Sequence, residues 1–148
     1  MQSHGKPGWY TCCGQRYYCQ SIAEGMFLTE IIEPAVKGGN ILYFKSQPGP
    51  FPYEYNYKSV PCTGTYTPDF YIEWDDGDKL YYEVKRGNIE QKSATKMKRF
   101  CLQYGTTKPL VLVWYGRLPT KGNRKKNLDK LKRGQNDSLL HHTWNIKR

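Results

Sequence analysis

The chain lacks the sequence features of several large protein classes. No apolar run approaches the ~18 to 20 residues that cross a bilayer, and the N-terminus carries no secretory signal. It also has no glycine-rich nucleotide-binding loop, no flavin fingerprint and no Ser-His-Asp order. These absences argue against a membrane protein, a nucleotide-dependent enzyme and a serine hydrolase. We therefore expect an intracellular, cytoplasmic protein.

Cysteine is present, but the spacing typical of metal ligands is missing. The cysteines are the clustered Cys12, Cys13 and Cys19 and the separate Cys62 and Cys101. No Cys-x-x-Cys pair occurs, and two adjacent cysteines cannot easily both reach one tetrahedral metal. A reducing compartment favours free thiols. Free thiols are therefore expected here, with a zinc site at the cluster and the nearby His4 as the alternative.

Acidic residues are few, and the resulting positive charge is concentrated at one end. Residues 1–116 hold 13 Lys and Arg against 11 Asp and Glu, a net of +2, whereas residues 117–148 hold 10 against 2, a net of +8. A chain of 148 residues with 38% hydrophobic content is compatible with one compact domain. We expect a core at 1–116, including an N-terminal extension, and a basic C-terminal arm at 117–148.

The predicted arm has the composition of a nucleic-acid-binding segment. Its cations could follow a phosphate backbone, an attraction that salt weakens and that carries no sequence readout. A solvated, partly disordered tail is the alternative, and the two overlap because basic arms often become ordered on binding. The apolar residues Leu139, Leu140, Trp144 and Ile146 predict an end that docks on the core. The candidate nucleic-acid-binding residues are Arg124, Lys125, Lys126, Lys130, Lys132 and Arg133.

The most informative motif is Tyr66-Thr67-Pro68-Asp69-Phe70, which is followed by Glu83-Val84-Lys85. Aromatic and apolar runs on either side of the turn residues 75–78 predict a β-hairpin. Side chains alternate along a strand, so Glu83 and Lys85 should share a face while Val84 packs behind them. If Asp69 lies alongside, two carboxylates and one ammonium converge.

These residue types suit metal-dependent phosphodiester cleavage. Asp and Glu are the usual protein ligands of Mg²⁺ or Mn²⁺, which neutralises phosphate charge and supplies hydroxide near neutral pH. A nearby ammonium can hold the attacking water or the developing negative charge. The bland interpretation of the same residues is a hairpin with ordinary surface charges.

The motif resembles the PD-(D/E)XK nuclease superfamily, and most closely TnsA-like transposon nucleases and phage endonuclease I-type junction resolvases. The resemblance covers roughly residues 20–116. It implies a restriction-endonuclease-like core, with Asp69, Glu83 and the carbonyl of Val84 binding Mg²⁺ or Mn²⁺ and Lys85 assisting catalysis. The stretch 48–58 departs from the pattern, because Pro50 and Pro52 do not suit a central strand.

A helix is predicted from Ser21 to Glu33, ending at Pro34. Many members of the superfamily carry a further acidic residue on such a helix, often within Ser-x-x-Glu. Ser21-Ile22-Ala23-Glu24 matches that pattern, so the resemblance favours Glu24 as a catalytic residue, with Glu30 as runner-up. Ser21 and Glu24 also fit a capping box, so a purely capping function for Glu24 is the alternative.

The hairpin is followed by further elements of an α/β core. Residues 91–104 predict an amphipathic helix, and 109–115 a strand buried on both faces. Helices at this position in related nucleases pack beside the active site, so Lys92 and Lys96 are candidate DNA contacts; solvated surface lysines are the alternative. The predicted order of helix, strands, hairpin, helix and strand fits a mixed central β-sheet flanked by helices.

The leading hypothesis is a Mg²⁺-dependent DNA endonuclease acting on branched DNA, specific duplex sites or transposon ends of a phage or mobile element. Pairing of two copies, as a homodimer, would allow both strands to be cut. The alternative is a non-catalytic nucleic-acid-binding accessory protein with the same fold. An RNA endonuclease is less favoured because no single-strand-binding aromatic pattern is visible. A histidine-metal nuclease would need histidines within the core, and His141 and His142 lie in the tail.

Overall fold

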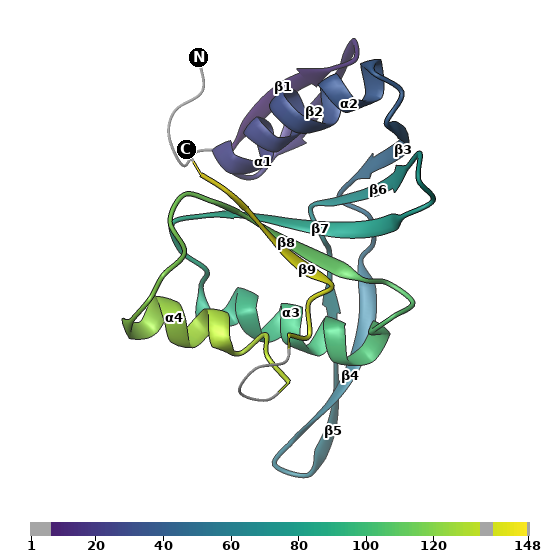
Figure 1. The fold of residues 1–148 in the computed structure, drawn as a ribbon. Coiled ribbons are helices and arrows are strands. Elements are labelled where there is room, and N and C mark those ends of the chain that lie inside the picture. The colour runs from purple at the N-terminus through teal and green to yellow at the C-terminus, as the bar shows by residue number, and fades with distance from the viewer. Residues whose placement is uncertain (1–6, 134–137, 148) are drawn as a thin grey trace.

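A five-stranded mixed β-sheet forms the centre of the protein (Figure 1). The computed structural model describes residues 7–133 and 138–147. The first three strands of the sheet are antiparallel and the last three are parallel. In spatial order they are β3 (Ile41–Ser46), β6 (Phe70–Trp74), β7 (Lys79–Arg86), β8 (Leu110–Tyr115) and β9 (His142–Ile146). The predicted α/β class with a mixed central sheet is confirmed.

Helices and hairpins cover both faces of this sheet. One face carries a hairpin of β1 (Gly8–Cys12) and β2 (Gln15–Cys19), followed by the helical segments α1 (Ile22–Phe27), η1 (Leu28–Ile32) and α2 (Glu33–Lys37). The other face carries α3 (Gln91–Tyr104) and α4 (Gly122–Asp129). A second hairpin, β4 (Phe51–Tyr57) with β5 (Val60–Tyr66), projects from the lower end in Figure 1. In the described residues, no helix is long and apolar enough to cross a membrane.

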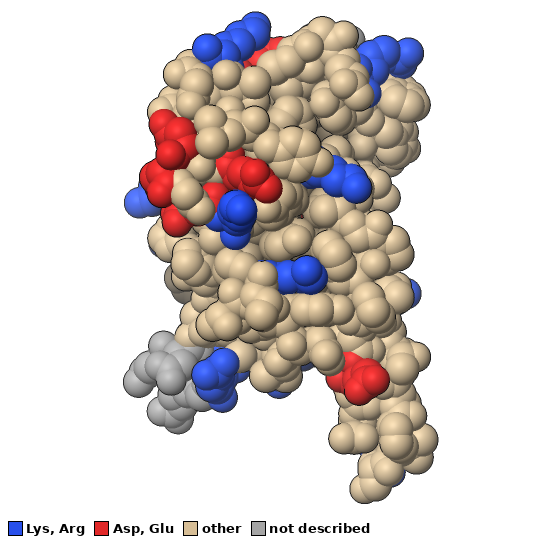
Figure 2. All heavy atoms as spheres, turned by 90° about the vertical axis from the view of Figure 1, so that its right-hand side faces the viewer, with Lys and Arg blue, Asp and Glu red and all other residues tan. Residues whose placement is uncertain are grey.

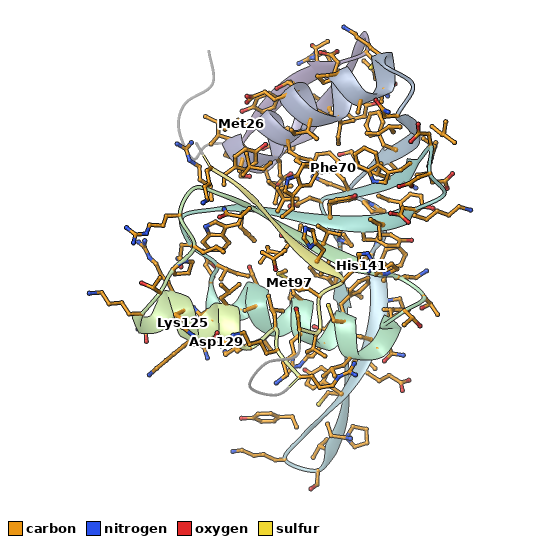
Figure 3. The ribbon with its side chains drawn as sticks, in the orientation of Figure 1. Met26, Phe70, Met97, Lys125, Asp129 and His141 are labelled. Atoms are coloured by element: carbon orange, nitrogen blue, oxygen red, sulfur yellow. The ribbon has the colours of Figure 1, made fainter. Side chains whose placement is uncertain are left out.

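Strand β8 separates two hydrophobic cores. Val111 and Val113 pack toward Phe27 in the core beneath α1, whereas Leu112 and Trp114 pack toward α3. All six residues of the strand are buried, as the continuous apolar run predicted. Figure 3 shows Phe70 in the upper core and Met97 of α3 in the lower one. The sheet is thus fixed from both sides.

The predicted hairpin of the motif is confirmed as β6 and β7. Their register pairs Phe70 with Tyr82, and a turn joins them in which the Trp74 N–H donates to the Asp78 carbonyl at 2.8 Å. Pro52, which did not suit a central strand, lies in β4 outside the main sheet, paired with Thr65. The proline-rich stretch therefore builds the projecting hairpin. It adds no strand to the central sheet.

The helix predicted to end at Pro34 continues to Lys37, so that boundary was wrong. A proline inside an α-helix removes one hydrogen bond and its ring clashes with the carbonyl four residues earlier. Here the wider π-helical turn of η1 precedes it, and the Glu33 N–H donates to the Leu28 carbonyl five residues back. Pro34 then stands in the first turn of α2, where the missing N–H is tolerated.

Gly25 allows α1 to approach the N-terminal hairpin closely. A Cβ atom at this position would lie 2.1 Å from the Tyr10 ring of β1. The Tyr10 ring of β1 therefore packs directly against the backbone of α1 at Gly25. This contact helps to hold α1 in place over strand β7 of the sheet.

The C-terminal segment, predicted as an arm with an anchored end, contributes a helix and a strand. β9 pairs in parallel with β8, with Trp144 beside Val113. The Trp144 ring meets Phe27 edge-on, with ring centroids 5.7 Å apart, and Ile146 packs on the same core. Leu139 and Leu140 pack on the lower core. Residues 134–137 and 148 of this segment lie outside the described residues.

We predict that Trp144→Ala lowers the free energy of unfolding by about 2 kcal/mol, since it removes a half-buried ring from the core around Phe27. The control is His142→Ala on the same strand, whose exposed side chain should contribute less than about 0.5 kcal/mol. Urea denaturation of both variants measures the difference. Equal stabilities would contradict the placement of β9 in the sheet.

Candidate active site

Asp69 is fixed at the start of β6 by its own backbone. Its N–H donates to the Tyr82 carbonyl at 2.9 Å, and its carbonyl accepts from the Gln47 N–H at 2.8 Å. The carboxylate is turned toward β7, where its Oδ2 accepts from the Val84 N–H at 2.7 Å. The Pro68-Asp69 step thus places this carboxylate against the strand that carries Glu83 and Lys85.

Glu83 and Lys85 lie on one face of β7, as strand alternation predicted. Lys85 Nζ lies 3.3 Å from Glu83 Oε2. The other carboxylate oxygen of Glu83 accepts a hydrogen bond from the Tyr66 hydroxyl, and only 7% of the Glu83 surface is exposed. Val84 points the opposite way, into the core around Phe27, while its N–H holds Asp69.

Glu24 reaches the same place from the first turn of α1. Ser21 Oγ accepts from the Glu24 N–H at 3.2 Å, and Glu24 Oε2 accepts from the Gln20 N–H at 3.2 Å. Glu24 therefore caps the helix, yet only 6% of its surface is exposed and its carboxyl interacts with Asp69. Glu30, the other candidate, is exposed. The structure thus brings Glu24 into the cluster and leaves Glu30 outside it.

The cluster carries more negative than positive charge in a buried setting. Burial, followed by the charges of Glu83 and Glu24, raises the pKa of Asp69 well above its usual value. The pKa of Glu24 is raised mainly by burial and also by Glu83, although hydrogen bonds from Gln20 and with Asp69 oppose this. Three carboxylates and one ammonium share this site, so an added cation would relieve their repulsion.

Lys85 remains a cation in this environment. Burial lowers the pKa of Lys85, but the charges of Glu83 and Asp69 raise it by more, and the net shift is upward. A protonated Lys85 is a hydrogen-bond donor at neutral pH and does not act as a base. The oxygens of the three carboxylates are hard ligands of the kind that Mg²⁺ and Mn²⁺ prefer.

Lys92 and Lys96 of α3 line an open groove together with Arg99 and with tyrosines of the β4–β5 hairpin. The groove has a volume of about 610 Å³. Both lysines are thus placed on one surface, as the sequence suggested, and Arg99 joins them there.

The cations of the C-terminal segment are distributed over α4 and the turn after it. Arg124, Lys126, Lys132 and Arg133 are exposed. Lys125 pairs with Asp129 at 2.7 Å (Figure 3). Lys132 pairs with the same carboxyl at 3.3 Å, and both lysines lower the pKa of Asp129. Lys130 Nζ donates to Thr95 Oγ1 of α3 at 3.5 Å. Part of the predicted binding surface is therefore committed to contacts within the protein.

A smaller hollow of about 480 Å³ connects α4 with the end of β7. Its lining includes Gly87, which follows the strand of Glu83 and Lys85, and the basic residues Arg117, Lys121 and Arg124. Positive charge therefore lies close to the end of the strand that carries the cluster.

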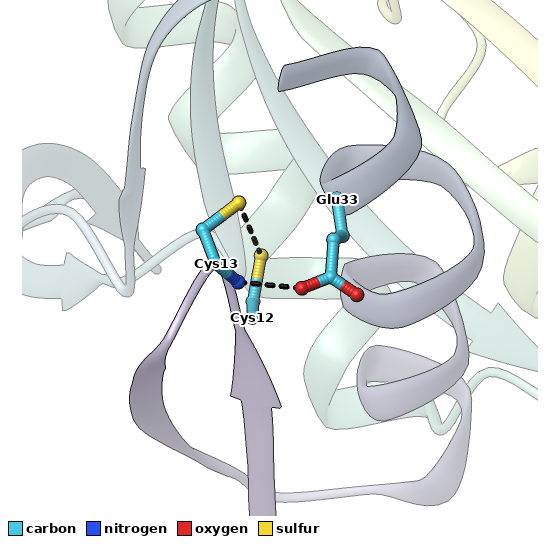
Figure 4. Close-up of side chains that lie close together, drawn as sticks. All are labelled: Cys12, Cys13 and Glu33. Carbon is cyan, nitrogen blue, oxygen red and sulfur yellow. Dashed lines mark hydrogen bonds between the residues drawn. The ribbon is translucent and has the colours of Figure 1, made fainter. Parts of the chain in front are cut away.

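The N-terminal cysteines separate into two environments. Cys12, Cys13 and Glu33 come together at the β1–β2 turn, with all three ligand atoms within 4.8 Å of one another (Figure 4). Cys19 lies at the opposite end of the hairpin, opposite Gly8. His4 lies outside the described residues, and His142 is exposed. In the part of the chain that the structure describes, no other three His, Cys, Asp or Glu side chains bring their ligand atoms this close together. The carboxylates of Glu24, Asp69 and Glu83 also do not meet this limit.

Two residues were not recognised from the sequence as part of the site. Tyr66 was quoted within the motif without a function, yet its hydroxyl is bonded to Glu83. Arg99 lies on the helix predicted at 91–104 but was not proposed as a DNA contact, and its guanidinium lies 3.5 Å from the centre of the Tyr55 ring. The position of Tyr66, three residues before Asp69 at the end of a strand, was the available signal for the first. No local sequence signal was available for Arg99, because its position depends on the packing of α3 against the β4–β5 hairpin, which is distant in the chain.

Comparisons of the chain with protein-family models, with curated proteins and with solved structures gave no match. Functional assignment therefore depends on the geometry and charge of the cluster itself.

The raised pKa of Asp69 predicts a pH-dependent cost to stability. The folded protein holds this proton more tightly than the unfolded chain, in which the pKa is about 3.9. Stability should therefore fall as the pH rises from about 4 through the folded pKa, and the loss is complete above it. Asp69→Asn should be more stable than the wild type, by a margin that grows over this range.

Urea denaturation from pH 4 to pH 8 measures that margin, with Asp76→Asn in the exposed β6–β7 turn as the control. A margin that is flat with pH, or that favours the wild type at high pH, would contradict the assigned environment of Asp69.

Proposed function

We propose that this protein is a Mg²⁺- or Mn²⁺-dependent endonuclease that hydrolyses phosphodiester bonds in DNA. The observation that carries the proposal is the convergence of Glu24, Asp69 and Glu83 around the single ammonium of Lys85. Burial of like charges costs stability, and a protein gains from it only where the charge is used. Binding a divalent cation is the use that three carboxylates suit best.

Asp69 and Glu83 are the residues proposed to hold the metal, with the carbonyl of Val84 as a further ligand. When bound, the ion would lower the pKa of a water molecule and neutralise charge on the phosphate. Asp69 is oriented for this by the Val84 N–H, and Glu83 by the Tyr66 hydroxyl, so neither needs to reorganise. Glu24 adds a third carboxylate from helix α1.

Lys85 is proposed to position the attacking water and to stabilise the negative charge that develops on the phosphate. Its raised pKa keeps it protonated, and its Nζ already lies beside Glu83. An ammonium in a site shielded from water stabilises an oxyanion more strongly than in bulk solvent. Lys85 and the metal ligands therefore act on the same phosphate from adjacent positions.

The arrangement of elements supports a restriction-endonuclease-like core at the finer level. Helix α1 packs on β7 and carries Glu24, the antiparallel β6–β7 hairpin carries the motif, and α3 leads to the parallel strand β8. The motif and this order agree with each other, and they come from separate observations. Branched DNA, specific duplex sites and transposon ends are all compatible substrates, and pairing of two copies would permit cuts in both strands.

DNA is the proposed partner because basic surfaces lie at α3 and at the end of β7, the strand that carries Glu83 and Lys85. Lys92 and Lys96 belong to the groove at α3, and Arg124 belongs to the hollow beside Gly87. Phosphate contacts of this kind supply affinity that salt weakens. The alternative function, a nucleic-acid-binding accessory protein, would use these surfaces without the cluster.

We predict that Asp69→Ala and Lys85→Ala each reduce cleavage of labelled DNA by about 10²-fold or more in Mg²⁺ or Mn²⁺, because each removes a group that acts on the scissile phosphate. Linear duplex, four-way junction and single-stranded DNA serve as substrates. Matched controls on the same hairpin are Asp76→Ala and Lys79→Ala. Both side chains are exposed, so these variants should cleave DNA at the wild-type rate.

Metal-dependent cutting that is lost in both site variants and kept in both controls supports the nuclease. Binding of DNA without cleavage of any substrate would contradict the nuclease function and would favour the accessory-protein function.

A further inference from the structure

The groove between α3 and the β4–β5 hairpin is a site of concentrated positive charge. Lys92, Lys96 and Arg99 contribute three cations, and no described residue that lines the groove carries a carboxylate. Among the ion pairs of the described residues, none involves these three side chains. A groove of this composition is complementary to a polyanion.

The opposite wall of the groove is a tyrosine-bearing surface that packing holds in place. Tyr53 is 3% exposed and lies against Gly64, where a Cβ atom would come within 2.6 Å of its ring. Tyr55 is covered by the Arg99 guanidinium at 3.5 Å, which links the hairpin to α3. In the space-filling view the hairpin stands out from the lower edge of the body with open space beside it (Figure 2). The wall is therefore preformed.

The groove and the carboxylate cluster are connected through the end of β5. Thr65 lines it, and the next residue, Tyr66, donates its hydroxyl hydrogen bond to Glu83. The Tyr66 ring also contacts Phe100 of α3, with centroids 5.0 Å apart. The groove and the cluster thus share the wall formed by the end of β5.

We propose that this groove binds the sugar–phosphate backbone of the DNA strand next to the phosphate that is cut. This inference rests on the proposed endonuclease function and specifies how the substrate is held. Lys92, Lys96 and Arg99 follow one another at single-turn spacing, about 5 to 6 Å along α3, so they can contact successive phosphates of one strand. Such contacts give affinity and register without reading the bases.

Binding is measured with the cleavage-deficient Asp69→Ala protein and fluorescein-labelled duplex in metal-free buffer, by anisotropy over a range of salt concentrations. Adding Lys92→Ala and Lys96→Ala should weaken binding about tenfold or more. It should also reduce the slope of log K against log salt by roughly 2, one unit for each lost phosphate contact. The control, Lys98→Ala with Lys79→Ala, removes the same charge outside the groove.

Equal losses in the groove and control variants would overturn the proposal, because they would reflect net charge alone; so would unchanged binding in the groove variant. The two claims fail separately in this design. If the groove variant loses affinity but wild-type protein cuts no substrate, the endonuclease fails and the groove stands. If the wild-type protein cuts DNA but the groove variant binds DNA as well as its parent, the endonuclease stands and the groove proposal fails.

A second observation concerns the β1–β2 turn. Cys12 Sγ and Cys13 Sγ are 3.8 Å apart, and the Cys13 N–H donates to Glu33 Oε2 of α2 at 2.5 Å (Figure 4). Side chains of adjacent residues in a strand point to opposite faces. Here Cys13 has a φ of +52° and Gly14 a φ of +80°, so the chain turns and both sulfurs reach one side. The turn removes the objection that adjacent cysteines cannot share a metal.

The sulfur separation matches that of two thiolates on one tetrahedral ion. Two Zn–S bonds of about 2.3 Å at a tetrahedral angle place their sulfurs about 3.8 Å apart. We infer that Cys12, Cys13 and Glu33 form a binding site for a borderline-soft divalent cation of the Zn²⁺ class. Cys12 is buried and Cys13 is exposed, so the cluster lies at the protein surface. A bound ion would tie the hairpin turn to α2.

Titration of the reduced protein with Co²⁺, a spectroscopic substitute for Zn²⁺, tests this site without reference to DNA. We expect a thiolate-to-cobalt charge-transfer band and tetrahedral d–d bands that Zn²⁺ abolishes. Cys13→Ser should remove the charge-transfer contribution of one sulfur, and Glu33→Gln should weaken affinity about tenfold or more. Cys62→Ser, on the β4–β5 hairpin, should bind like the wild type. Absence of the bands, or the same loss in Cys62→Ser, would overturn the site.

Discussion

The fold holds the carboxylates of Glu24, Asp69 and Glu83 close together in a buried site beside the ammonium of Lys85. Each would be better solvated apart, and their mutual repulsion, added to burial, raises the pKa of Asp69 and of Glu24. The hydrogen bond from the Val84 N–H and the ion pair with Lys85 offset only part of this cost. The scaffold must therefore supply the remainder.

That scaffold is the sheet with its two cores. Strand β8 is buried on both faces and fixes β7 from one side, while β6 fixes it from the other. Helix α1 packs on β7 and meets β1 in the close contact of Gly25 with Tyr10, and from this position Glu24 interacts with Asp69. Apolar packing at a distance thus determines the position of each charged group, and the cost of bringing them together is distributed over the fold.

Local signals made part of this architecture predictable. The β6–β7 hairpin, the helix at 91–104 and the buried strand β8 follow from periodicity and turn residues, and strand alternation placed Glu83 beside Lys85. The helix end predicted at Pro34 was wrong because the π-helical turn that accommodates this proline has no clear sequence signal. The fifth strand β9 and the groove between α3 and the β4–β5 hairpin depend on contacts between residues far apart in the chain, which no local pattern contains. The approach of the Cys12 and Cys13 sulfurs was missed because it depends on the positive φ angles of Cys13 and Gly14, which the sequence pattern does not reveal.

The proposed function depends on the binding of a divalent metal ion by the carboxylate cluster. The most direct measurement is anomalous X-ray diffraction from crystals of the protein soaked in Mn²⁺. We expect a peak within coordination distance of both Asp69 and Glu83, which disappears in crystals of Asp69→Asn. A peak that remains in that variant, or no peak at the cluster when Mn²⁺ binds elsewhere, would contradict metal binding by the cluster.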